Sequence, residues 1–138
     1  MNMNHELVPV LGNTIISIEM LGMMDVLDVD TYDGIGARGA LELKFNNNKT
    51  LRIIDDGQSC CEERYMTTDD VLSDYVGATL LGMELKEPVE CDTNYNDDMA
   101  HDTVFLEILT SKGSLTIVNH NRHNGYYAGF DIETRILG

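Results

Sequence analysis

Short runs of alternating apolar and polar residues, joined by turn-forming residues, limit this chain of 138 residues to β structure. The clearest pair of runs is Ala40–Phe45 and Thr50–Asp55, in which the leucines and the phenylalanine of the first run fall on one face. Asn46–Lys49 lies between them, and asparagine tolerates the left-handed backbone of a tight turn. This pattern predicts an antiparallel hairpin.

The same alternation predicts the other strands. A second hairpin is expected from Thr103–Thr110 and Ser114–Val118, which are joined through Ser111–Gly113. Single strands are expected over Thr14–Met20, Thr79–Lys86 and Phe130–Leu137. In the first of these strands, Ile16, Ile18 and Met20 are predicted to share one face.

Helix signals are few. Thr67 or Thr68, followed by Asp69 and Asp70, predicts one short helix over Asp69–Tyr75 that Gly77 ends. Met1–Val10 is expected to be irregular, and Glu90–Asp102 is expected to be a polar loop. Because no second helix is available for parallel crossovers, we predict a mainly β (α+β) fold. It would be an antiparallel curved sheet or small barrel of about six or seven strands with one short helix.

Composition limits the organisation and the partners. The length suits a single domain over 1–138, with a core over about 11–137. The 24 acidic and 9 basic residues give a net charge of −15, which argues against direct nucleic-acid binding. No signal peptide and no apolar run of membrane-spanning length is evident, so no membrane partner is expected. The cysteine pattern, with Cys60, Cys61 and Cys91 as free thiols, favours the reducing cytoplasm.

The most polar stretch, Asn119–Phe130, is predicted to be a recognition loop, because few of its side chains would be chosen to fill a core. Amides match the edges of a nucleobase, tyrosine and histidine offer flat faces for stacking, and arginine binds phosphate. The alternative is that the asparagines build turns and the tyrosines cap a sheet edge. The candidate ligand-binding residues are Arg64, Tyr65, Asn119, His120, Asn121, Arg122, His123, Asn124, Tyr126 and Tyr127.

Metal and catalytic sites are not expected. The spacing of the cysteines and of His101, His120 and His123 suits no tetrahedral zinc site, and no other cofactor is indicated. Glu62 and Glu63 adjoin the paired cysteines, and negative neighbours raise the pKa of a thiol and so oppose a nucleophilic thiolate. We therefore predict that the protein is not an enzyme.

Four short pieces carry a resemblance to a known family. They are Leu11–Thr14, Cys60-Cys61-Glu62, Asp74–Ala78 and Asn124–Tyr127. With them the chain resembles, from about Leu11 to Ile136, a family of small proteins of unknown function found in bacteriophages and bacteria. The resemblance implies a phage-linked setting and supports the fold outline, but it implies no activity. Asn119–Asn124 departs from the family pattern.

Two functions are therefore considered. The first is a phage-type, non-enzymatic accessory protein that binds and sequesters a small nucleotide-like ligand, such as a host defence signal, in the host cytoplasm. The second is an acidic inhibitor that imitates nucleic acid and binds a basic host protein. Half-exposed strands in a small sheet protein often pair between copies, so a homo-oligomer is expected in either case.

Overall fold

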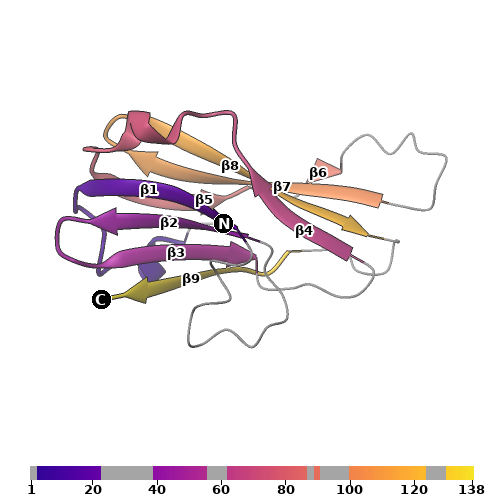
Figure 1. The fold of residues 1–138 in the computed structure, drawn as a ribbon, viewed down its shortest axis with the longest axis horizontal. Coiled ribbons are helices and arrows are strands. Elements are labelled where there is room, and N and C mark those ends of the chain that lie inside the picture. Colours follow the sequence, from indigo (N-terminus) through magenta and orange to yellow (C-terminus); the bar gives the residue numbers. More distant parts are fainter. Residues whose placement is uncertain (1–2, 23–38, 56–61, 87–88, 91–99, 124–129) are drawn as a thin grey trace.

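Two antiparallel sheets make up the described part of the chain, which in this computed structural model comprises residues 3–22, 39–55, 62–86, 89–90, 100–123 and 130–138 (Figure 1). The four-stranded sheet has the order β1-β2-β3-β9, formed by Ile15–Gly22, Gly39–Phe45, Thr50–Asp55 and Ile132–Leu137. The five-stranded sheet has the order β4-β8-β7-β5, formed by Glu62–Thr67, Gly113–His123, Ala100–Thr110 and Leu80–Leu85, with β6 (Val89–Glu90) beside β7.

The predicted mainly antiparallel β architecture is thus confirmed, but the way in which the strands are divided into sheets differs from the prediction. The strands form two separate sheets rather than one curved sheet, and they close no barrel in the described part of the chain. The reason is the path of the chain: it leaves the first sheet after β3, builds the second sheet, and returns only with β9. The predicted strand number was too low, because β4 and the two-residue β6 were not assigned.

One hydrophobic core joins the two sheets. The side chains that were predicted to share a face of the first hairpin, Leu41, Leu43 and Phe45, are fully buried in it. They belong to the same cluster as Leu106 and Ile117 of the second sheet. Burying a side chain of this size contributes about 1.5–3 kcal/mol, so packing across this layer stabilises the contact between the sheets.

The predicted turns form as expected. Asn48 adopts the left-handed region with φ of 67°, and the Phe45 N–H donates to the Lys49 carbonyl across the first turn at 2.9 Å. In the second hairpin, Gly113 has φ of 115°, and β7 pairs with β8 without interruption from Thr110 opposite Gly113 to Ala100 opposite His123.

Strand β1 contains a bulge that the alternation did not reveal. The register with β2 shifts between Ile15 and Ser17. Ile15 is therefore fully buried and Ile16 is 55% exposed, whereas Ile18 and Met20 pack against the core. The predicted common face of Ile16, Ile18 and Met20 is wrong at its first member, because a bulge inserts one residue and reverses the facing of those before it.

The helical segments are short 3-10 turns. The predicted helix begins only at Leu72, and η2 spans Leu72–Tyr75, followed by Gly77 with φ of 90°. The N-terminal stretch is not wholly irregular, because η1 spans Asn4–Leu7 and buries Leu7 in the core. Neither turn has the length or the apolar character that a membrane-spanning helix needs.

The predicted recognition loop is partly a strand. Asn119–His123 belongs to β8, so the loop prediction is wrong for these five residues. The same holds for Ala100–Asp102, which the predicted polar loop included and which lie in β7. Pairing with the neighbouring strands stabilises this polar segment as strand, although asparagine is intrinsically uncommon there. Residues 124–129 of the predicted loop lie outside the described residues.

Candidate functional site

The alternation of β4 and β8 sorts the predicted ligand-binding residues onto opposite faces of the second sheet. We call the face that packs on the core the inner face and the opposite one the outer face. Arg64 pairs with Asn121 in the register, and Tyr65 pairs with His120. Successive side chains on a strand point to opposite sides, so each pair occupies a different face. The predicted set therefore does not form one site.

A row of aromatic rings crosses the outer face. Tyr65 and His120 are stacked with ring centroids 4.4 Å apart and planes 4° from parallel. His101 continues the row, with its centroid 5.1 Å from that of His120 and 6.5 Å from that of Tyr65, so the three rings form a bent row. Neighbouring strands lie about 4.8 Å apart, so rings at this spacing stand side by side, one from each of β4, β8 and β7. We call Tyr65, His120 and His101 the ring row.

Hydrogen bonds link the ring row to β4. Nε2 of His101 lies 2.9 Å from Nδ1 of His120, and Nε2 of His120 lies 2.7 Å from the Thr67 hydroxyl oxygen. A hydrogen bond between two ring nitrogens needs one proton and one lone pair. The two imidazoles therefore share one proton at this contact, and the pair holds at most one positive charge while the bond is intact.

The surroundings favour the neutral histidines. Burial lowers the pKa of His101, as does the nearby Arg122 guanidinium, while Asp102 opposes them. Burial also lowers the pKa of His120, and His101 adds to the effect. Arg122 is exposed on the outer face, opposite His101 in the register, and it places a cation beside the ring row.

The inner face has a different character. Asn119 and Asn121 are fully buried there, and the Asn119 amide donates to the Val104 carbonyl at 3.4 Å. Arg64 is also buried and donates to Oδ1 of Asp55 at 2.7 Å. These side chains face the interior of the molecule, so they do not join Tyr65, His120 and Arg122 on the outer face.

The buried Asp55 carboxylate joins three segments of the chain. Its Oδ1 accepts a hydrogen bond from Arg64 of β4 and another from the Asp131 N–H at 2.8 Å. Burial raises the pKa of Asp55, although both of these hydrogen bonds and the Arg64 charge oppose the shift. The contacts of Arg64 and Asp55 are those of a structural ion pair between the sheets.

The remaining predicted residues are only partly placed. His123 ends β8, but its side chain is not described, and Asn124, Tyr126 and Tyr127 lie outside the described residues, as do Cys60, Cys61 and Cys91. In the part of the chain that the structure does describe, no three metal-binding side chains gather at one point.

His101 and Thr67 were not predicted among the ligand-binding residues. His101 lies in a segment that was predicted to be a loop, and Thr67 was considered only as a helix cap. One signal was available: extending the second hairpin with its own register places position 101 opposite position 122 and position 103 opposite position 120. Extending the pairing through the polar residues would have brought His101 to His120.

The fold and the outer face together define a two-sheet antiparallel β protein that presents stacked imidazole and phenol rings beside a cation. The chain belongs to the family described as a domain of unknown function (DUF7448), which matches residues 8–132. Neither the curated proteins nor the solved structures that were compared with the chain gave a match.

Proposed function

We propose that this protein binds a planar, negatively charged small molecule of the nucleotide type on its outer face and holds it without turnover. The observation that carries the proposal is the ring row, whose near-parallel Tyr65 and His120 rings lie on the same face as the exposed Arg122. In the phage-linked setting that the family resemblance implies, the bound molecule would be a host defence signal and the function would be its sequestration.

The chemistry of the outer face fits each part of such a ligand. A nucleobase extends the row by stacking on an outer ring, and stacking on an aromatic side chain contributes about 1–3 kcal/mol per base. The guanidinium fork of Arg122 matches two oxygens of a phosphate. With a net charge of −15, the protein repels anions at long range, so a cation at the site is required.

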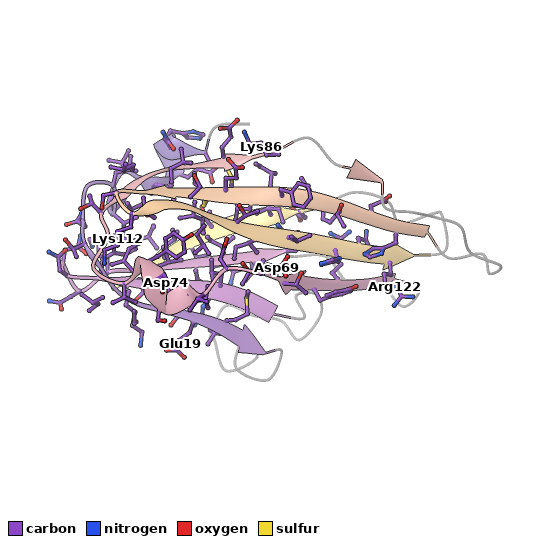
Figure 2. All side chains as sticks on the ribbon, turned by 90° about the horizontal axis from the view of Figure 1, so that it is seen from above. Glu19, Asp69, Asp74, Lys86, Lys112 and Arg122 are labelled. Atoms are coloured by element: carbon purple, nitrogen blue, oxygen red, sulfur yellow. The ribbon has the colours of Figure 1, made fainter. Side chains whose placement is uncertain are left out.

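The experiment is calorimetric titration of the purified protein with mononucleotides and cyclic dinucleotides, together with nucleotide analysis of the supernatant after heat denaturation. We expect Tyr65→Ala and Arg122→Ala each to weaken binding by about fivefold to a hundredfold, because each removes about 1–3 kcal/mol of stacking or phosphate contact. Lys112→Ala is the matched control, since Lys112 lies at the opposite end of the β7–β8 hairpin from Arg122 (Figure 2). It removes the same charge and should leave binding within about twofold.

Normal binding by both variants would show that the ligand does not use the outer face. Recovery of a chemically altered ligand from the wild-type protein would instead contradict binding without turnover. The two parts of the proposal therefore fail separately.

The second candidate, binding to a basic host protein, is favoured by the acidic surface around η2. Asp74 lies within η2 and Asp69 precedes it, and both side chains are exposed. Glu19 is exposed on β1, which packs against η2 (Figure 2). Reduced hydration raises the pKa of Tyr75, and the nearby Asp70 and Asp74 carboxylates raise it further, as expected in a negative field. Capture of a basic protein that is lost in high salt and in Asp69→Asn/Asp74→Asn, but kept in Arg122→Ala, would favour this candidate.

A further inference from the structure

Strand β9 forms an edge of the four-stranded sheet. One side of β9 pairs with β3, and no described strand pairs with its other side (Figure 1). An open groove of about 470 Å³ is lined by Glu6 and by Ile132, Glu133, Thr134 and Arg135. Consecutive strand residues point to opposite faces, so a groove that touches four in succession runs along the edge of β9. Among the described residues, Glu6 borders this edge and its carboxylate accepts a hydrogen bond from the Thr134 hydroxyl at 3.0 Å, while the groove leaves the edge open to another strand.

The sequence of β9 is complementary to itself in the antiparallel sense. It reads Ile132-Glu133-Thr134-Arg135-Ile136. When two copies are opposed around Thr134, each Ile132 lies opposite the other copy's residue 136, and each Glu133 lies opposite the other copy's residue 135. Opposite charges at directly facing positions stabilise a sheet by about 0.2–1 kcal/mol per pair. The facing isoleucines add apolar contact between the copies.

We propose that β9 pairs with β9 of a second copy of this chain across a two-fold axis at Thr134. The two four-stranded sheets then form one continuous sheet, and each chain contributes the same surface, as a two-fold interface requires. Within one chain, Arg135 Nη2 lies 3.8 Å from Glu133 Oε2 along the same strand. In the dimer each of these groups also faces the opposite charge of the other copy.

The charge pattern is what selects a second copy as the partner. The other edge strand of this sheet, β1, carries Glu19 as its single charged residue, so self-pairing of β1 supplies no opposite charge. A protein with a net charge of −15 also repels its own copies in general. Association therefore requires a local surface on which both signs alternate, and β9 provides one.

The test measures the mass of the full chain by sedimentation equilibrium over a range of concentrations, for the wild type and for charge-reversal variants. We expect the wild type to dimerise, and Glu133→Arg and Arg135→Glu each to weaken dimerisation on the order of a hundredfold, because each places like charges opposite one another. An equimolar mixture of the two variants restores opposite charges at both positions and should form the heterodimer. The double variant Glu133→Arg/Arg135→Glu should form a homodimer again.

Glu19→Arg on β1 is the control, since it makes the same charge change at the other edge of the same sheet, and it should leave the wild-type dimer intact. Circular dichroism of each variant separates loss of pairing from loss of folding. A wild type that is monomeric throughout overturns the proposal. So does a dimer that survives both single reversals, and so does a mixture of folded variants that fails to associate.

Discussion

At the scale of single residues, the His101–His120 contact is unusual because both partners are titratable and share one proton. Its direction is coupled to Thr67, whose hydroxyl either accepts a hydrogen bond from His120 Nε2–H or donates one to Nε2. The chain from the hydroxyl through His120 to His101 therefore has two neutral arrangements that differ only in direction. Full protonation of both imidazoles would place two N–H groups against each other and break the contact.

This contact predicts a loss of stability in acid. The pKa values of both histidines are lowered from 6.5, so the unfolded chain takes up protons first as the pH falls. The contribution of the two neutral histidines to the free energy of unfolding is fully present above pH 6.5. It is lost as the pH falls through their lowered pKa values in the folded protein. We expect the free energy of unfolding to be smaller at about pH 5.5 than at about pH 7.5. Urea denaturation should show a smaller difference for His101→Gln/His120→Gln, whereas equal differences would contradict the assignment.

The same residues show how much of the site could be predicted from the sequence. Tyr65, His120 and Arg122 were predicted as candidates, and the structure brings them to one face. Arg64 and Asn119 were predicted with them, but they lie on the other face because a strand, unlike a loop, sends neighbours apart. The candidates were chosen by the chemistry of their side chains alone. The face to which each side chain points depends on strand pairing, and the polar composition of the segment did not indicate a strand.

At the scale of elements, hairpins were predictable and boundaries were not. The first hairpin was correct because an alternating pattern and an asparagine turn agree with each other. Strand β4 was missed because Glu62–Thr67 is largely polar, and β8 is its one strand partner among the described residues. Turn η1 was missed for a related reason: it is held by contacts with β5, a strand far from it in sequence.

One side chain anchors η1 to β5 and can be tested. Asn4 Oδ1 accepts from the Met83 N–H at 2.9 Å, and a Cβ added at Gly82 would lie 2.8 Å from that oxygen. We expect Gly82→Ala and Asn4→Ala each to lower the free energy of unfolding by about 1 kcal/mol, the usual value of a hydrogen bond. Because both changes remove the same bond, urea denaturation of the double variant should show a loss well below the sum of the single losses. Additive losses would show that Gly82→Ala acts elsewhere.

At the scale of the whole molecule, the sheets are joined by the apolar core and by the buried Arg64–Asp55 pair. The apolar core could be predicted, since the buried leucines and isoleucines follow from the alternation of apolar and polar residues. The ion pair could not, because nothing in the sequence distinguishes Asp55 and Arg64 from the many exposed charges around them. It exists only because the end of β3 and the start of β4 meet when the sheets pack.

The ion pair is expected to stabilise the fold without contributing to ligand binding. Arg64→Met leaves Asp55 buried without its counter-charge, and removing one partner of such a pair costs about 3–5 kcal/mol. The double variant Arg64→Met/Asp55→Asn keeps an oxygen for the Asp131 N–H and removes the charge, so it should recover part of that loss. Guanidinium denaturation measures both effects. A stable Arg64→Met protein that has lost ligand binding would instead assign Arg64 to the binding site.

The late position of β9 has a consequence for biosynthesis. A ribosome releases β1, β2 and β3 first, yet β3 acquires its second neighbour only after every strand of the other sheet has left the exit tunnel. The β7–β8 hairpin, whose strands are adjacent in the chain, can form while β3 still has one free side. The order of synthesis therefore allows the second sheet to form before the first is complete, and β3 keeps one strand edge without its β9 neighbour until then.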